Sequence, residues 1–302
     1  MRIAIVGATG FVGSRLVEQL HTEGHQVTIL TRNPTQATSR FPTATVVGYS
    51  PLKSGVWQES LSGCDAVVNL AGEPIAEKRW TSTQKQSILD SRKLGTQKIV
   101  EAINQAAVKP QVLINASAIG YYGTSETAKF DETSPAGTDF LAKVCQEWET
   151  AAQAVTASGT RLVILRLGIV LGENGGALGK MLAPFSAFVG GPIGSGKQWF
   201  SWIHRDDVVK LIIKAIIDTQ MQGVYNATAP HPVTMQDFAQ TLGTVMSRPS
   251  WLPVPNFALE ALLGEGAIVV LQGQQVVPTQ TLAKGFEFGY STLTPALQAI
   301  LG

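Results

Sequence analysis

The chain has 302 residues, 44% of them hydrophobic and 15% charged, which is the composition of a folded globular protein and not of a disordered or fibrous one. This length fits one large domain, or one domain with a smaller lobe. The formal net charge is +1, from 23 basic and 22 acidic residues. Because like charges form no run, the sequence argues against nucleic acid as a partner.

Cysteine spacing and apolar run length exclude further classes. Cys64 and Cys145 stand outside any CxxC or clustered Cys/His spacing, so neither a disulfide framework nor a metal site is predicted. Apolar runs such as LIIKAII, which Lys214 interrupts, are too short to span a membrane. RIAIVGATG follows Met1 directly and no targeting segment is visible, and we therefore expect a cytoplasmic or stromal-type soluble protein.

In the first half, short apolar runs alternate with helix-period segments, a pattern typical of repeated βαβ units that build a parallel sheet. Consecutive Val, Ile and Leu residues indicate strands that helices cover on both faces. Strands are predicted over residues 2–8, 26–32, 43–49, 65–72, 111–118 and 161–172. Helices are predicted between them over residues 11–23, 81–107 and 139–158.

After Gly172 the chain becomes richer in glycine, with the stretches GENGGALGK and GGPIGSGKQ. Helices are predicted there over residues 206–218, 234–246, 256–271 and 291–301. We expect an α/β fold in which a Rossmann doubly wound parallel sheet occupies residues 1–172 and is completed by parts of 198–230. Residues 173–302 are expected to form mainly a smaller C-terminal substrate or partner lobe.

The stretch Gly7-Ala-Thr-Gly10-Phe-Val-Gly13 follows the first predicted strand and opens the first predicted helix. In such a turn the first glycine permits a tight bend, the second lets a pyrophosphate approach the backbone, and the third lets helix pack on strand. The free N–H groups at the helix start favour negative charge. The placement predicts a dinucleotide-binding loop; a tight turn without a ligand is the alternative.

The second predicted strand ends with Thr31-Arg32-Asn33, and no acid is present there to bind a ribose 2′-hydroxyl. A guanidinium matches a 2′-phosphate with charged hydrogen bonds, so the sequence favours NADP(H) over NAD, with Arg32 as the phosphate ligand. A solvated surface arginine is the alternative. Residues 69–72 (NLAG) end the fourth strand with small side chains, at the sheet edge where ligands of open α/β sheets bind.

Several segments together resemble the extended short-chain dehydrogenase/reductase group, which includes sugar-nucleotide epimerases and dehydratases: GATGFVG, NLAGEPI, ILDSRKLGTQKIVEAI, ASAIGYYG, LRLGIVLG and GVYNATAP. With GGPIGSGKQWFSWIH and the DUF1731-like tail from LLGEGAIVVL to GFEF, the chain more narrowly resembles the YfcH-type epimerase family. The resemblance covers essentially the whole chain. It implies a seven-stranded Rossmann sheet, a small C-terminal α/β lobe and NADP(H) as cofactor.

The resemblance also implies which residues bind the cofactor. Arg92, on the helix after the fourth strand, and Ile169, beside the nicotinamide, are included, with a solvated arginine and an ordinary buried aliphatic residue as the alternatives. The full set is Gly7, Thr9, Gly10, Phe11, Val12, Gly13, Thr31, Arg32, Leu70, Ala71, Gly72, Arg92 and Ile169.

The catalytic pattern of the group is missing. In the group a tyrosine is followed four residues later by a lysine on one helix, and the lysine and the cofactor ribose lower the tyrosine pKa so that it can pass a proton. Neither Tyr121 nor Tyr122 has a lysine at that spacing, and the residue four before Lys143 is Asp139. We therefore expect an atypical active site.

Two further positions depart from the group. Aligned without gaps, ASAIGYYG puts Ala118 where the group has a serine, and Ser117 then points to the opposite face of its strand. Phe200 stands where sugar-nucleotide enzymes carry a diphosphate-binding arginine, although Lys197 is a nearby substitute. Because a phenyl ring cannot bind phosphates, we expect a non-nucleotide substrate.

The remaining polar groups supply the candidates for chemistry. Tyr122 is the predicted substrate contact, with packing against Tyr121 as the alternative, and Glu149 is a candidate catalytic carboxylate, with a solvated helix position as the alternative. His204 is expected to cap or orient the next helix through Asp206, whose side chain suits an N-cap, with a catalytic histidine as the alternative.

Two functions are compatible with these residues. The first is an NADP(H)-dependent oxidoreductase or epimerase-like enzyme acting on a small non-nucleotide substrate. The second is a non-catalytic NADP(H)-sensing protein, in which the cofactor sets the shape of the C-terminal lobe and so its affinity for a protein partner. A homodimer is compatible with both.

Overall fold

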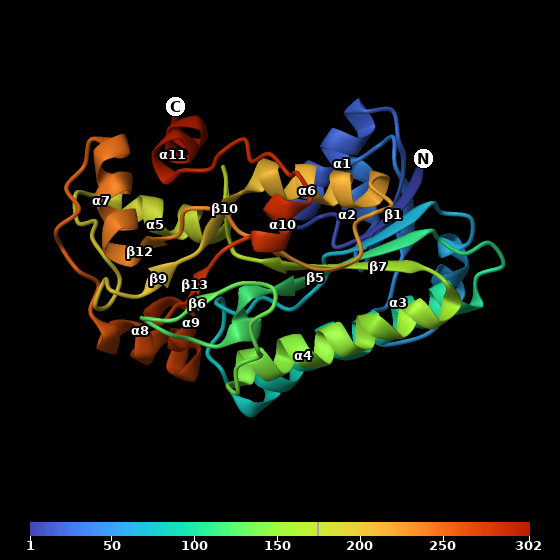
Figure 1. Ribbon diagram of the computed structural model, residues 1–302, viewed down its shortest axis with the longest axis horizontal. Coiled ribbons are helices and arrows are strands. Elements are labelled where there is room, and N and C mark those ends of the chain that lie inside the picture. The colour runs from blue at the N-terminus through green and yellow to red at the C-terminus, as the bar shows by residue number, and fades with distance from the viewer. Residues whose placement is uncertain (174) are drawn as a thin grey trace.

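A parallel sheet of seven strands forms the centre of the computed structural model, which describes residues 1–173 and 175–302 (Figure 1). The strand order is β11-β7-β5-β4-β1-β2-β3. This arrangement confirms the predicted doubly wound α/β fold. The strands are β1 (Arg2–Val6), β2 (Gln26–Thr31), β3 (Thr45–Gly48), β4 (Ala66–Asn69), β5 (Val112–Ala118), β7 (Arg161–Leu167) and β11 (Gly223–Ala227).

Helices cover both faces of the sheet (Figure 1). One face carries α1 (Phe11–Thr22), α2 (Pro34–Arg40) and α6 (Arg205–Ile217), and the other carries α3 (Ser82–Gln105) and α4 (Phe140–Gln153). Side chains alternate along β1, so Ile3 and Ile5 join the first core while Ala4 and Val6 join the second. Each fully buried Ile or Leu contributes about 1.5 to 3 kcal/mol.

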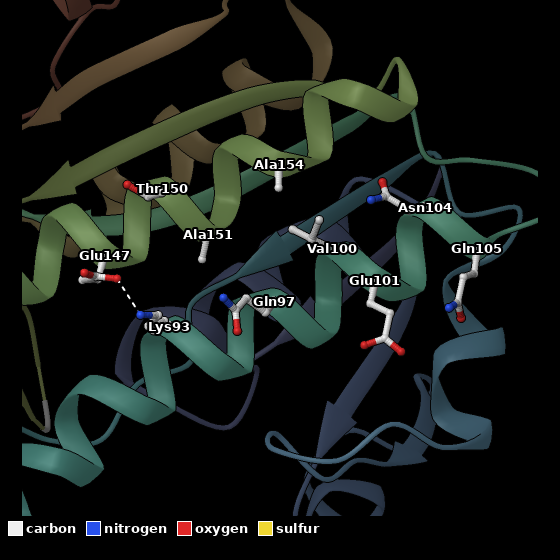
Figure 2. Close-up of a pocket in the computed structure, with 10 residues that line it drawn as sticks. All are labelled: Lys93, Gln97, Val100, Glu101, Asn104, Gln105, Glu147, Thr150, Ala151 and Ala154. Carbon is white, nitrogen blue, oxygen red and sulfur yellow. Dashed lines mark ion pairs between the residues drawn. The ribbon is translucent and has the colours of Figure 1, made fainter.

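The outer side of α3 and α4 carries a groove of about 480 Å³ (Figure 2). Polar and small apolar residues line it together, and Lys93 on α3 pairs with Glu147 on α4, Nζ to Oε2, at 2.8 Å. This ion pair ties the two helices together at the surface. It also holds Glu147 on the side of α4 that lines the groove.

The C-terminal lobe has its own core, in which Phe185, Trp202, Phe238 and Leu297 are buried together. The lobe lies beyond the carboxyl ends of the sheet strands (Figure 1). Its elements are β8 (Ile169–Leu171), α5 (Gly176–Ser186), β9 (Trp199–Phe200), β10 (Trp202–His204), β12 (Val233–Thr234), α7 (Met235–Met246), α8 (Asn256–Leu263), α9 (Ile268–Leu271) and α11 (Leu293–Leu301). Three smaller elements are β6 (Lys129–Phe130), which pairs with β13 (Gln275–Val276), and α10 (Thr279–Ala283).

The structure corrects several predicted boundaries. The helix expected over 256–271 is broken: α8 ends before Gly264, whose φ of 59° lies in the left-handed region, and α9 begins only at Ile268. The strand expected over 161–172 is divided into β7 and β8 at Gly168. Helices α2 and α5 were not predicted. None of the helices within the described ranges is long and apolar enough to cross a bilayer.

Gly13 is expected to tolerate no side chain, because a Cβ there would lie 2.2 Å from Gly7 O and 2.8 Å from Ala8 Cα. Gly13→Ala should lower the free energy of unfolding, measured by urea denaturation, by about 1 to 3 kcal/mol. Gly179→Ala is the matched control, since nothing lies within 4 Å of that helical position. An alanine at position 13 as stable as the wild type would contradict this packing of α1 on β1.

Candidate functional site

The turn between β1 and α1 forms a cradle of backbone N–H groups. Gly7 has φ of 87°, and a Cβ there would lie 2.9 Å from the carbonyl carbon of Leu70, so the turn lies directly against the chain that leaves β4. Gly10 caps α1, and a Cβ on it would meet only Gly7 O, at 3.2 Å. Because α1 begins at Phe11, its first amides have no acceptor within the helix and form its positive end. The cradle fits a pyrophosphate.

Two guanidinium groups border this cradle. Arg32 is exposed directly after β2, where Thr31 Oγ1 accepts from Asn33 N at 3.2 Å. Arg40, in the last turn of α2, donates from Nη1 to Thr9 O in the glycine turn at 3.3 Å. The sequence had singled out only Arg32. Positive charge at the end of β2 suits a ribose 2′-phosphate.

Arg92 is held between the chain after β4 and the helix α4. A Cβ on Gly72 would lie 2.9 Å from Arg92 Cζ, and Arg92 Nη1 donates to Glu73 O at 3.0 Å and to Ile88 O at 3.2 Å. The guanidinium carbon lies 5.0 Å from the centre of the Trp148 ring. Burial lowers the pKa of Arg92. This arginine is therefore packed and not solvated.

A cavity of about 390 Å³ opens at the carboxyl ends of β5 and β7, between the sheet and the C-terminal lobe. Four of the predicted cofactor residues line it: Phe11, Val12, Arg92 and Ile169. A further part of the lining is one apolar cluster, made of Ile75, Trp80, Phe140, Val144, Ile268 and Val269. A dinucleotide on the glycine turn and a second small molecule would thus share one cavity.

Helix α4 presents Leu141 and Cys145 to this cavity. Four residues apart, they lie on one face of the helix, beside Gly120, where a Cβ would lie 3.3 Å from Leu141 Cβ and 3.9 Å from Cys145 Sγ. They have the spacing of the tyrosine and lysine in the resembled group. Sequence reasoning missed them because it searched for those two residue types rather than for the spacing.

The Cys145 thiol is buried, and its Sγ donates to Ala118 O at 3.7 Å. Burial raises the pKa of Cys145 to about 11, so the group is a neutral thiol at pH 7. Ala118 lines the cavity, whereas Ser117 lies outside its lining and donates to Glu149 on α4. The different surroundings of these two residues agree with the alternation predicted for them.

Tyr122 and Glu149 meet in a buried network around Arg166. Glu149 accepts from Arg166 Nε and Nη2, both at 2.8 Å, and from Ser117 Oγ at 2.6 Å. The Tyr122 hydroxyl accepts from Arg166 Nη1 at 3.0 Å and donates to Asn226 Oδ1 at 2.7 Å. The network joins α4 to β5, β7 and β11.

The network lies in the wall of the cavity and does not reach its lining. Tyr122 is 3% exposed, Arg166 4% and Glu149 9%. Burial raises the pKa of Tyr122 to about 12, opposite in direction to what proton transfer at neutral pH requires. Tyr122 and Glu149, the two predicted catalytic side chains, thus form hydrogen bonds inside the protein. Neither of them is a solvated surface group.

The segment from Gly194 to His204 offers no phosphate site. Phe200 is 4% exposed, and its ring centre lies 4.2 Å from that of Phe238 in the core of the lobe. Lys197 is exposed and lies outside the cavity lining. Trp199 does line the cavity and donates from Nε1 to Glu126 O at 2.9 Å.

His204 itself caps α6, because its Nδ1 accepts from Asp206 N at 3.1 Å. The predicted role of Asp206 as the cap is wrong: its carboxylate pairs instead with Arg15 Nε on α1 at 2.8 Å. Burial lowers the pKa of His204, and its ring lies 4.1 Å from that of Tyr290. Its role is therefore to fix α6.

The described residues contain no group of three or more His, Cys, Asp or Glu side chains placed to hold a metal ion. Cys64 and Cys145 are both buried free thiols. A parallel Rossmann sheet, a glycine-rich turn and a cavity at the carboxyl ends of the strands together define a dinucleotide-binding protein of the short-chain dehydrogenase/reductase type.

The chain belongs to the NAD dependent epimerase/dehydratase family, whose model matches residues 3–227. Residues 254–300 match a domain of unknown function, DUF1731. The chain is 49% identical over 303 residues to "Epimerase family protein SDR39U1 homolog, chloroplastic" of Arabidopsis thaliana, covering 100% of this chain and 87% of that protein. It is 40% identical over 302 residues to "Epimerase family protein YfhF" of Bacillus subtilis, covering 100% and 98%.

Solved structures agree with this assignment. The crystal structure of human epimerase family protein SDR39U1 (isoform 2) with NADPH is 38% identical and superposes with a TM-score of 0.89, covering 99% of each chain. A UDP-glucuronic acid 4-epimerase from Bacillus cereus, 18% identical, superposes with a TM-score of 0.80 over 99% of this chain and 98% of that one. The second likeness shows a shared fold alone.

Replacing Arg32 tests the cofactor end of the site. Arg32→Ala should weaken NADPH binding by about 1.5 to 3 kcal/mol, the scale for losing a charged hydrogen bond, and leave NADH binding nearly unchanged. Isothermal titration of both cofactors measures this difference. Equal losses for NADPH and NADH would mean that Arg32 does not bind the 2′-phosphate.

The buried network can be tested by stability. Glu149→Ala should lower the free energy of unfolding by about 3 to 5 kcal/mol, because it leaves the Arg166 charge buried and unpaired. Glu147→Ala, which removes a surface carboxylate two residues earlier, should cost less than about 1 kcal/mol. Thermal and urea unfolding compare the two. A stable Glu149→Ala protein that had lost only activity would restore Glu149 as a catalytic candidate.

Proposed function

We propose that the chain is an NADP(H)-dependent oxidoreductase that acts on a small non-nucleotide substrate. The observation that carries this is the single cavity that runs from Phe11 and Val12, beside the cofactor cradle, to Leu141 and Cys145 on α4. The cradle, Arg32 and the small residues after β4 would hold the cofactor, and the NADPH in the human relative supports its identity. When bound, this cofactor supplies a hydride.

The residues of the chain leave little choice of proton donor. The titratable side chains that line the cavity, among the residues described, are Arg92, Asp139 and Cys145. Arg92 is bound to two carbonyls, and Asp139 Oδ1 accepts from Ala142 N at 2.9 Å as the cap of α4. The Cys145 thiol or a water molecule is left to move the proton. Tyr122 and Glu149 then serve to fix α4.

A non-catalytic NADP(H) sensor is the second candidate, and one contact favours it. The ring of Phe11, at the start of α1, fills the space over Gly175 and Gly176, where a Cβ would lie 2.9 and 3.0 Å from it. The glycine turn therefore touches the C-terminal lobe directly. Cofactor binding would then set the position of the lobe and its affinity for a protein partner.

The domain division at residue 172, the homodimer and the cytoplasmic location stay predictions from the sequence. The predicted division already assigns parts of 198–230 to the first domain, and α6 and β11, which lie within that range, belong to its sheet layers.

The two candidate functions differ in turnover. The protein should oxidise 4-deuterated NADPH in the presence of one or more neutral ketones, aldehydes or quinones. Absorbance follows the oxidation, and mass spectrometry should recover deuterium in the alcohols formed from ketones and aldehydes. Gly10→Glu is the control, since a side chain there meets only Gly7 O and fills the pyrophosphate position. NADPH that binds tightly but is oxidised by no member of the panel would favour the sensor.

A further inference from the structure

Resting on the proposed function, we infer that the apolar part of the cavity binds a neutral, flat, apolar molecule such as an aromatic ketone or a quinone. We call this part the apolar chamber and define it by Ile75, Trp80, Phe140, Val144, Ile268 and Val269. Reduction of a ketone whose ring lies there would break the C=O π bond, form a C–H bond with the hydride of NADPH and an O–H bond with a proton from Cys145 or water, and leave NADP⁺, while solvent would return a proton to Cys145.

The shape of the chamber suits a ring. Its six side chains come from three places in the fold: the chain after β4, the start of α4, and α9 in the C-terminal lobe. They belong to one hydrophobic cluster, in which the rings of Trp80 and Phe140 lie 5.1 Å apart, nearly edge to face. A flat aromatic molecule packs against such faces and edges with a further gain of about 0.5 to 1.5 kcal/mol.

Polar groups at the border of the chamber are already paired within the protein. Trp80 Nε1 donates to Ile75 O at 2.8 Å, and Thr124 Oγ1 donates to Gln272 Oε1 at 2.8 Å. Gln274 Nε2 donates to Ile119 O at 2.8 Å. A charged substrate would lose its water and find few groups ready to replace it. The chamber therefore selects against charge.

Two cations close to the chamber, Arg92 and Lys85, are already paired within the protein. Arg92 is bound to the carbonyl oxygens of Glu73 and Ile88. Lys85, whose Nζ lies 5.4 Å from the centre of the Phe140 ring, pairs with Glu265 of the lobe. Each positive charge thus has partners outside the chamber.

The lobe closes the chamber by holding Trp80. The Trp80 amide donates to Leu263 O at 3.2 Å, and Arg79 Nη1 donates to Ala261 O at 2.9 Å. The indole covers Gly266, where a Cβ would lie 2.8 Å from Trp80 Cδ1. Because the chain breaks between α8 and α9, Gly266, which has no side chain, lies against the indole. The same break places α9 in the wall of the chamber.

The experiment uses the NADP⁺-loaded protein, so that binding is measured without turnover. The probes are 2-acetylnaphthalene, which is neutral, and 6-acetyl-2-naphthoate, which has the same ring and ketone plus a carboxylate. Isothermal titration should show the neutral ketone binding at least tenfold more tightly. Equal or tighter binding of the carboxylate, or no saturable binding of the neutral ketone, would overturn the inference.

Two variants locate the binding. Gly266→Ala should displace Trp80 and weaken the neutral ketone at least tenfold without changing the Kd for NADPH, while Gly179→Ala should change neither. Ile268→Lys should raise affinity for the carboxylate, a gain that misfolding cannot imitate. Unchanged ketone affinity in Gly266→Ala, or no gain in Ile268→Lys, would overturn the inference.

Failure of the proposed function has a different signature. Tight binding of the neutral ketone with no deuterium transfer from NADPH would refute the enzyme and leave the chamber in place. Deuterium transfer to charged and neutral carbonyl compounds alike would refute the chamber and leave the enzyme in place.

A separate observation concerns the cofactor end, where the geometry points to Arg40 as a second ligand of the 2′-phosphate. Its hydrogen bond to Thr9 O sets the guanidinium on the glycine turn, on the side of β2. The adenosine ribose lies between that turn and the end of β2 in this fold. Arg32 and Arg40 would then approach the phosphate from its two sides.

Arg40→Ala should raise the Kd for NADPH about tenfold, leave the Kd for NADH unchanged and reduce the salt dependence of NADPH binding. Arg40→Lys should restore part of the affinity. Arg248→Ala, at an arginine of the C-terminal lobe that stacks on Phe188, is the control and should change none of these. Equal weakening of both cofactors would show that Arg40 acts only by shaping the turn through Thr9.

Discussion

The buried ion pair between Arg166 and Glu149 is the constraint on which the site depends. Arg166 stands on β7 and Glu149 on α4, and two nitrogens of one guanidinium donate to two oxygens of one carboxylate at 2.8 Å. Such a pair contributes little net stability, because both charges lose their water, but breaking it is costly. Its forked geometry also permits one relative placement of helix and strand. This ion pair therefore fixes the rotation of α4 about its axis and its position along β7.

That placement fixes one face of α4 along its whole length. In the first turns, Leu141 and Cys145 face the cavity at the spacing at which related enzymes carry tyrosine and lysine. One turn further along the same face, Trp148 packs against Arg92 and Glu149 pairs with Arg166 of the sheet. The residues that hold the helix and the residues that line the cavity thus stand in different turns. The fold and cofactor cradle can therefore persist while the reaction changes.

Local patterns in the sequence were enough to predict the sheet and the cofactor cradle. The role of each of these features depends on a few neighbouring residues. The glycine turn needs backbone freedom, the apolar strands are buried, and Arg32 carries a positive charge. Contacts between distant residues were not predictable. No residue near Trp80 in the sequence indicates that its amide donates a hydrogen bond to Leu263 O. Likewise, no residue near Glu149 indicates that its carboxylate accepts from three donors on β5 and β7. The break at Gly264 was missed because an apolar run of helical period continued through it.

The pairing of the cations near the chamber bears on how a proton would move in the proposed reaction. Hydride transfer to a neutral ketone would place negative charge on the substrate oxygen, beside Arg92 and Lys85, which already have partners. An alkoxide is a far stronger base than a thiolate, so even a thiol with a pKa of about 11 is able to protonate it. The same raised pKa keeps Cys145 from attacking the carbonyl carbon at neutral pH. Burial of Cys145 thus favours proton donation over covalent chemistry, without the tyrosine and lysine of the wider group.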